Sequence, residues 1–325
     1  MSVKVLKTFE IEEEVWLSYS KGFNDSFSRN KSIDELKAFY SNTVFGYSIH
    51  ALSFEDNKKI NGGSTIMPFP YLVNKEKSFF GLSVSSFVNK EFRKDAFLLH
   101  DLVETLCRYC KENNIVLFYG VPNTNSYSYF NKLLGFETLF NLNYYVIPFR
   151  IGSILKLKNK RFLNMISEYS FKLYSIIISH LTHPWDSKQP DLNVHLENNP
   201  EFLGIRFKNG YKSRADNGYS VTYKSVIEDN LKAIYVMDYR YDGIKSSRGL
   251  SYAICNIIKS EDPDIILYVG LIRHFQLNLF RLPEKWHPKK LPVIYKLIES
   301  PHDHFYSTIS NGNNWDFSLI NFDVR

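Results

Sequence analysis

Two basic residues, Arg93 and Lys94, stand at the start of a predicted helix over residues 95–113. The first backbone N–H groups of a helix have no partner within it and carry the positive end of its dipole, so they attract anions. A predicted strand over residues 79–88 leads into this turn and brings the helix start to a strand end. The pattern indicates an anion site. The alternative is an ordinary helix start capped by Asp95.

A polar residue, Asn123, follows the next predicted strand, over residues 115–121, in the sequence Gly120-Val-Pro-Asn. An asparagine amide offers both a donor and an acceptor, and a loop after a strand presents them to a ligand. The alternative is that Pro-Asn forms only a turn before the short helix predicted over residues 125–134.

Two residues are candidates for proton transfer. His50 lies on a central predicted strand, and Asp238 lies near the end of one predicted over residues 232–241. Either could accept a proton from an amine if it faces a cleft. The alternatives are a hydrogen-bonded core histidine and an aspartate paired with Arg240 or Arg248.

The cysteines and histidines form no recognisable metal motif. Cys107 and Cys110 lie in the middle of a predicted helix, on its apolar face, so we expect two core thiols rather than a zinc or redox site. His287, His302 and His304 lack the spacing of a known site. We therefore expect no bound metal.

Hydrophobic periodicity predicts a mixed fold in which the second half repeats the element order of the first. The first half reads as strand 2–8, helices 11–22 and 32–40, strands 47–54, 62–73 and 79–88, the segment above, and a strand after Phe136. The second half reads as strands 203–208, 218–225 and 232–241, helix 249–259, strand 265–271, a short helix near 274–280 and strand 291–299. The expected division is 1–150, a connector over 151–200, and 201–325.

The composition is that of an ordinary globular protein: 325 residues, 44% hydrophobic and 23% charged, with a net charge of +6. It contains no Lys/Arg-rich run of the kind that binds nucleic acid. The longest uncharged apolar stretch, residues 173–179, is far below the roughly 20 residues that span a bilayer. The N-terminus does not resemble a signal peptide. We expect a cytoplasmic protein without membrane insertion. The amphipathic helix predicted over 156–182 could touch a membrane, but a linker helix between two domains is the favoured interpretation.

The segment from Phe79 to Arg150 resembles the acyl-CoA-binding half of the GNAT acyltransferase superfamily. Its loop Arg93-Lys-Asp-Ala, its turn Gly120-Val-Pro-Asn and its Lys132-Leu-Leu-Gly-Phe carry this resemblance. With the repeat and the tail 313–323, the whole chain resembles sugar N-acyltransferases that have two GNAT-like domains and are related in fold to the Fem peptidyltransferases. The resemblance implies an α/β (α+β) fold of two tandem domains, each a mixed, mostly antiparallel sheet flanked by helices.

The resemblance implies acyl-CoA as co-substrate and no tightly bound cofactor. The CoA-binding residues that it implies lie at two strand ends and in the basic loop: Phe87, Val88, Arg93, Lys94, Asp95, Ala96, Phe97 and Asn123. The family has glycine or alanine where Leu98 stands, and many members have a tyrosine acid where Asn131 stands.

The implied acceptor is the amino group of a nucleotide-linked amino sugar, such as a dTDP-sugar of bacterial surface polysaccharide (lipopolysaccharide O-antigen) synthesis. The implied acyl group is 3-hydroxybutyryl. Tyr241, Arg248 and Trp315 of the degenerate second half are the candidate acceptor-binding residues. Two alternatives remain open: another amine acceptor, and a non-catalytic ligand-binding module, which the altered loop at Arg93 favours.

Overall fold

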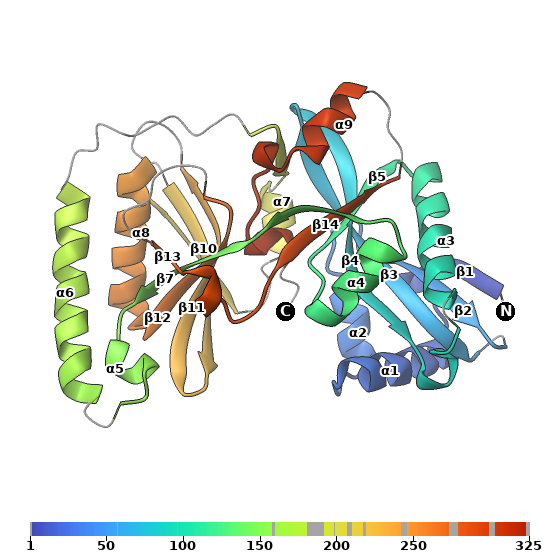
Figure 1. The fold of residues 1–325 in the computed structure, drawn as a ribbon, viewed down its shortest axis with the longest axis horizontal. Helices are drawn as coiled ribbons and strands as arrows, with labels where there is room; N and C mark the ends of the chain where they lie inside the picture. Colours follow the sequence, from blue (N-terminus) through green and yellow to red (C-terminus); the bar gives the residue numbers. More distant parts are fainter. Residues whose placement is uncertain are drawn as a thin grey trace.

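The computed structural model describes most of the chain. It leaves undescribed residues 1, 57, 96, 158–159, 181–191, 198, 207–209, 217–218, 242–245, 273–278, 299–302 and 323–325. It describes the backbone alone for residues 175, 178–180, 216, 219, 241, 246–252 and 303–304. The described elements form two mixed sheets with helices on their faces, which confirms the predicted fold class (Figure 1).

The first half contains the predicted elements with small shifts at their ends. They are β1 Ser2–Lys7, α1 Glu13–Phe27, α2 Ile33–Tyr40, β2 Ile49–Phe54, β3 Ile60–Val73, β4 Glu76–Val88, α3 Leu98–Glu112, β5 Ile115–Gly120 and α4 Thr124–Lys132. The single strand expected after Phe136 is two strands, β6 Glu137–Asn141 and β7 Asn143–Pro148.

The second half departs further from the prediction. Its elements are α5 Ile151–Ile154, α6 Lys160–His180, β8 Val194–Leu196, α7 Pro200–Arg206, β9 Tyr211–Asp216, β10 Tyr219–Glu228, β11 Leu231–Tyr241, α8 Ser246–Glu261, β12 Ile265–Gly270, β13 Phe280–Arg281, β14 Pro292–Leu297 and α9 Asp303–Ser310. The strand predicted over 203–208 is wrong. Pro200 begins a helix there, and the Asn199 side chain caps it by accepting the Phe202 N–H at 2.8 Å. The helix predicted near 274–280 falls almost wholly outside the described residues.

The two sheets share a strand pattern. The first runs β1-β2-β3-β4-β5-β14-β6, with β8 beside β3, and the second runs β13-β7-β12-β11-β10-β9. In each sheet a parallel pair, β4·β5 or β11·β12, is followed by two antiparallel neighbours. The order β3-β4-β5-β14-β6 in the first sheet therefore matches β10-β11-β12-β7-β13 in the second.

Each half of the chain contributes one strand to the other half's sheet. β7 precedes the expected division at residue 150, yet it pairs with β12 and β13 in the second sheet. β14 comes from the second half and lies between β5 and β6 in the first sheet. The two strands cross between the sheets in Figure 1. A single cut near residue 150 therefore does not separate the sheets.

Helices cover both faces of the first sheet. α1 and α2 pack over a core that includes Trp16, Tyr40 and Phe80, and α3 packs on the other face through Leu102 and Leu106. Cys107 and Cys110 are free thiols turned into this second core, and burial raises the pKa of Cys107 to about 11. The structure thus places both cysteines in the core, as the helical spacing predicts.

The helix predicted as a linker between two domains lies elsewhere. α6 packs against α5 and α8, at the end of the molecule farthest from the first sheet (Figure 1). That prediction is wrong because the exchanged strands, not the helix, join the two halves. No described helix is long and apolar enough to cross a bilayer.

Candidate functional site

The strands β4 and β5 separate near their carboxyl ends. Their parallel pairing ends at Leu82 and Tyr119. Just beyond, β4 pairs Ser83 with Ile66 and Ser85 with Thr65 on β3, so Val84 is an extra residue without a ladder partner. A bulge of this kind bends a strand and redirects its side chains. The bend opens a split between two strands that are paired over their first residues.

A cleft of about 170 Å³ occupies this split. Its walls come from α1, β4, the end of β5, the turn before α4, α4 itself and β14: Phe27, Ser83, Val84, Ser85, Ser86, Gly120, Val121, Pro122, Asn123, Ser126, Phe130 and Ile294. Ile294 is supplied by the exchanged strand. The second half of the chain therefore builds part of the first sheet's cleft.

Asn123 lies at the edge of the cleft and also caps α4. Its side-chain oxygen accepts the N–H groups of Asn125 and Ser126 at 3.0 and 2.9 Å. Its amide nitrogen makes no hydrogen bond within the described part of the chain, and the residue is exposed. The two sequence interpretations are thus compatible, because the oxygen forms the turn while the nitrogen can still donate.

Ser85 receives a directed hydrogen bond from the buried side of the sheet. The Tyr40 hydroxyl donates to Ser85 Oγ at 2.8 Å, and Tyr19 donates to Tyr40 at 2.7 Å. Burial raises the pKa of Tyr40 to about 12, so its hydroxyl keeps its hydrogen. Because Ser85 already accepts from Tyr40, its own hydrogen is free to point elsewhere, and it meets no acceptor among the described residues. Ser85 therefore presents a donor to the cleft.

His50 ends this chain of hydroxyls. Tyr19 uses its one hydrogen on Tyr40, so Thr65 must donate to Tyr19, and His50 Nδ1–H then donates to Thr65 across 3.0 Å. His50 Nε2 lies 3.1 Å from Thr8 Oγ1. The ring is fully buried, and burial lowers its pKa to about 3. The prediction of His50 as a catalytic base is wrong, since the ring reaches no cleft and is a neutral core group.

The basic loop starts α3 without a glycine-rich turn. Arg93 donates from Nε to the Val88 carbonyl at 3.0 Å and lies beside Ser26, and Lys94 is exposed. The Asp95 side chain accepts the Phe97 N–H at 3.0 Å. One of the backbone N–H groups that could bind an anion is therefore already bonded to a carboxylate.

The other loop residues are less informative. Phe97 is 72% exposed, and Leu98 is buried in the core beneath α3. Ala96 lies outside the described residues. Whether the loop binds CoA stays a prediction.

Two residues expected at the split lie beyond it. Phe87 and Val88 still pair with Gly63 and Gly62 on β3, and neither lines the cleft. The Phe87 side chain is 4% exposed and stacks edge-on against Tyr19. The sequence placed the split at the end of β4, whereas the bulge at Val84 places it at Ser83–Ser86.

Neither Asp238 nor Trp315 lines the cleft. Asp238 is paired with Arg240, with 2.8 Å between Oδ2 and Nε. This ion pair is the alternative to a catalytic role that the sequence left open. Trp315 is fully buried, and its indole N–H donates to the Ile309 carbonyl at 2.7 Å. The prediction that Trp315 binds an acceptor is therefore wrong. The side chains of Tyr241 and Arg248 lie outside the described part of the structure.

The second sheet has an equivalent split that the chain itself fills. β11 and β12 stop pairing after Val236 and Tyr268, and Met237 is the bulged residue. The 3-10 helix η5, Leu319–Asn321, contacts both strands, and Ser318 Oγ donates to the Met237 carbonyl at 3.0 Å. The 3-10 helix η5 therefore covers the place where β11 and β12 stop pairing.

Asn131 stands where the sequence resemblance implies a tyrosine acid, and it has a structural role. Its amide donates to the Phe136 carbonyl at 3.0 Å. The nearby Tyr129 is 56% exposed and does not line the cleft. No group of three or more His, Cys, Asp or Glu that could hold a metal occurs among the described residues.

The sequence reasoning missed Ser85 and Tyr40. The sequence does contain a sign of this site, because three serines, Ser83, Ser85 and Ser86, interrupt an otherwise apolar strand. Polar groups in a buried strand require hydrogen-bond partners, and Tyr40 is one.

Comparisons with known proteins show the fold. Neither a protein-family model nor a curated protein matches the chain. Solved structures do match, and three of them are described here. GCN5-related N-acetyltransferases from Anabaena variabilis and Kribbella flavida each have a TM-score of 0.57 at 11% identity, over 92% of this chain and 73% of theirs. Saccharomyces cerevisiae N-myristoyltransferase with bound myristoyl-CoA has a TM-score of 0.52 at 9% identity, over 90% and 82%. The two sheets with their exchanged strands thus have the fold of the GCN5-related N-acetyltransferases.

Proposed function

We propose that this chain is an acyl-CoA-dependent N-acyltransferase that holds the thioester arm of acyl-CoA in the split between β4 and β5. The observation that carries the proposal is a cleft with two donors, the Ser85 hydroxyl and the Asn123 amide, that have no acceptor among the described residues. A thioester carbonyl and the amide carbonyls of the CoA arm are acceptors of matching chemistry. A solved neighbour of the same fold is described with bound myristoyl-CoA.

In the proposed reaction, the amine nitrogen forms a bond to the thioester carbonyl carbon, and the carbonyl oxygen gains negative charge. Donors aimed at that oxygen stabilise the tetrahedral intermediate. Ser85 is one donor, and cooperative hydrogen bonds from Tyr19 and Tyr40 strengthen it. The carbon–sulfur bond then breaks, and the CoA thiolate leaves. The proton lost by the nitrogen passes to water or to the thiolate, which needs no strong acid.

The acceptor and acyl group in this proposal come from the sequence resemblance. They are the amino group of a nucleotide-linked amino sugar and a 3-hydroxybutyryl group. Residues 1–150 would bind acyl-CoA, with Arg93 and Lys94 near the diphosphate, and the second half would bind the acceptor through Arg248 and Tyr241. Arginine suits a diphosphate because its planar fork donates two bonds at once.

Two observations favour a second candidate, a non-catalytic ligand-binding module. The Asp95 carboxylate holds the Phe97 N–H, and Leu98 is buried where the family has a small residue. Both features weaken the anion site at the start of α3. Such a module would bind CoA or another ligand in the cleft and release no free thiol from acyl-CoA.

The test measures thiol release from a panel of acyl-CoAs with amine acceptors that include nucleotide-linked amino sugars. Ser85→Ala should lower kcat about 100-fold, the scale of losing one oxyanion donor. Ser86→Ala is the matched control, because this neighbour also lines the cleft but shares its hydroxyl with Ser64 at 2.9 Å. It should change kcat by less than about 3-fold, since the Ser85 donor remains.

A third variant separates catalysis from stability. Tyr40→Phe breaks the hydrogen bond to Ser85 and also the one from Tyr19, so it should destabilise the fold at least as much as Ser85→Ala. It leaves the Ser85 hydroxyl in place, so kcat should fall much less than in Ser85→Ala. If Tyr40→Phe and Ser85→Ala lose kcat equally, Ser85 has only a structural role. Calorimetric binding of CoA without thiol release from any pair would favour the non-catalytic module, and absence of both would end the proposal.

A further inference from the structure

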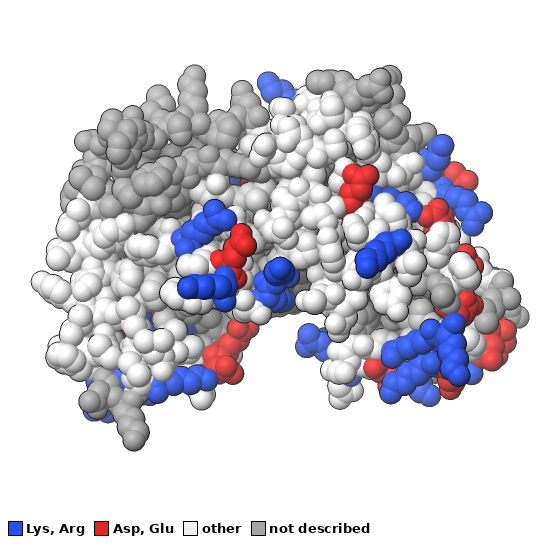
Figure 2. All heavy atoms as spheres, in the orientation of Figure 1, with Lys and Arg blue, Asp and Glu red and all other residues white. Residues whose placement is uncertain are grey.

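The helix α6 exposes an apolar face. Large apolar side chains on this face are 45–71% exposed: Phe162, Met165, Ile166, Tyr169, Leu173, Ile176 and Ile177. They recur at helical spacing, so they form one stripe along most of the helix. Figure 2 shows mainly uncharged atoms along the edge of the molecule where Figure 1 places α6. A continuous exposed apolar surface of this kind marks an interaction site.

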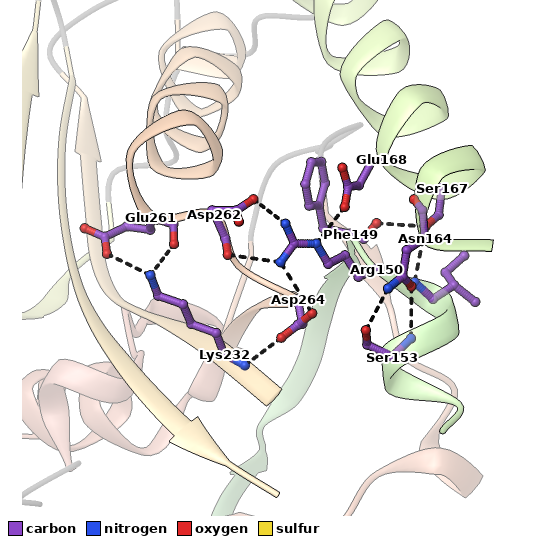
Figure 3. Close-up of polar contacts among 11 residues, drawn as sticks. Phe149, Arg150, Ser153, Asn164, Ser167, Glu168, Lys232, Glu261, Asp262 and Asp264 are labelled. Atoms are coloured by element: carbon purple, nitrogen blue, oxygen red, sulfur yellow. Dashed lines mark hydrogen bonds and ion pairs between the residues drawn. The ribbon is translucent and has the colours of Figure 1, made fainter. Parts of the chain in front are cut away.

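The face of α6 opposite the stripe is turned inward and carries both apolar and polar residues. Phe171 on this face packs against the second core, and polar contacts fix the rest. Ser167 Oγ donates to the Phe149 carbonyl at 2.9 Å. Asn164 Oδ1 accepts the Ser153 N–H at 3.0 Å. These contacts tie the helix to the chain that precedes it (Figure 3).

An ion-pair cluster fixes the same orientation. Arg150 donates to Glu168 on α6 at 2.6 Å and also pairs with Asp262 and Asp264 after α8 (Figure 3). Rotating the helix to bury its apolar stripe would break the Arg150–Glu168 pair and both hydrogen bonds. The stripe therefore faces outward because specific contacts hold it there.

The exposed charges on α6 are basic. Lys160, Arg161 and Lys172 are exposed, whereas the acidic Glu168 is engaged by Arg150. By helical spacing, Arg161 and Lys172 flank one side of the stripe, and Lys172 Nζ lies 5.9 Å from the Phe149 ring centre. A basic flank beside an apolar stripe is complementary to an anionic lipid surface. A symmetric pairing of two α6 helices would place the same patch on both sides, and the one carboxylate of α6, Glu168, is already engaged by Arg150, so no acidic residue of the helix is left to oppose the cations. The charge pattern thus favours a bilayer over a second copy.

We propose that α6 docks this protein on anionic membrane surfaces, lying flat in the headgroup region with its apolar stripe among the acyl chains. The helix does not span the bilayer; it binds at the interface. This inference does not depend on the proposed acyl transfer, because its test measures binding alone.

The test is co-sedimentation of the full chain with vesicles of phosphatidylcholine, with and without 30% phosphatidylglycerol. We expect binding to the anionic vesicles only, weakened by salt because surface charges are screened. Ile166→Glu combined with Leu173→Glu should lower binding at least 10-fold by placing carboxylates in the stripe. Ile227→Glu is the matched control, because Ile227 is 78% exposed on β10. This variant should bind like the wild type.

The charge contribution is tested by Arg161→Glu with Lys172→Glu, which should also lower binding at least 10-fold while leaving the apolar stripe intact. Sedimentation velocity on the same proteins tests the second copy as occupant. A wild-type dimer that the Ile166/Leu173 variant converts to monomer, with no vesicle binding, overturns the proposal. Equal binding to neutral vesicles, or equal loss in the Ile227 control, overturns it as well.

Discussion

Gly120 and Gly270 end equivalent strands, β5 and β12, but only Gly120 borders an open cleft. A methyl group on Gly120 would meet Ser83 Cβ at 3.5 Å, an ordinary contact. A methyl group on Gly270 would lie 2.7 Å from the Phe317 carbonyl oxygen, because the chain's own tail covers that strand end. The glycine at the end of the equivalent strand therefore lines a cleft in the first sheet and makes a close packing contact in the second.

The two glycines should respond differently to alanine. Gly270→Ala forces the tail away from β12, and overpacking of this kind costs on the order of 1–3 kcal/mol, so its Tm should fall by several degrees. Gly120→Ala should keep the wild-type Tm but lower CoA affinity about 10-fold, because its methyl group narrows the split. Differential scanning calorimetry and titration calorimetry of both variants check this. A normal Tm for Gly270→Ala would contradict the packing described here.

Asn123→Asp separates the turn from the ligand contact. Aspartate caps α4 as well as asparagine does, so the fold should be unchanged. The variant lacks the free amide donor at the cleft, and turnover or CoA affinity should fall about 10-fold. Asn123→Ala loses both functions and should lower the Tm as well. Full activity in Asn123→Asp would leave Asn123 as a turn residue only.

Asp95→Asn tests whether the start of α3 lies beside the CoA diphosphate. An asparagine oxygen can still accept the Phe97 N–H, so the loop should keep its conformation. Removing a negative charge next to a bound diphosphate should raise CoA affinity several-fold at low salt. Asp101→Asn, in the first turn of the same helix, is the control. If both variants bind CoA like the wild type, the anion site lies elsewhere.

His50 should make stability depend on pH. Its pKa is about 3 in the folded state, below the ordinary value of 6.5. As the pH falls below about 6.5, the unfolded chain binds a proton that the native ring does not. The free energy of unfolding should therefore fall by up to roughly 1.4 kcal/mol per pH unit until the pH nears 3.

Urea unfolding at pH 7, 6 and 5 checks this dependence against His50→Gln, which lacks the titrating ring. The advantage of the wild type over the variant should shrink as the pH falls. Parallel pH dependence in both proteins would show that His50 does not titrate in this range.

Truncation after Arg150 should yield a chain that does not fold. The fragment keeps β7, which has lost its partners β12 and β13, and it lacks β14, which fills the gap between β5 and β6. Unpaired strand edges promote aggregation. Solubility and circular dichroism of residues 1–150 test this expectation. A stable, cooperative fragment would show that the first sheet can close without the exchanged strand.

Much of the first half could be predicted from its sequence because its elements are long and strongly periodic. α3 shows this, since Leu102, Leu106 and Cys110 repeat at helical spacing and face the core. The exchange of β7 and β14 could not be predicted, because local patterns carry no information on which distant strand a segment will pair with. Ser85 was missed for a similar reason: its role depends on Tyr40, 45 residues away. Trp315 was misplaced because composition alone does not tell a stacking ring from a core ring.

The position of β14 also fixes an order of events during synthesis. β5 and β6 leave the ribosome some 150 residues before the strand that separates them in the native sheet. Synthesis proceeds at about 5–20 residues per second, so the first sheet waits several seconds or more with a vacant place beside β5. During that interval Gly120 and the cleft have no Ile294 wall. The cleft therefore gains its last wall only after β14 has been made and has paired with β5.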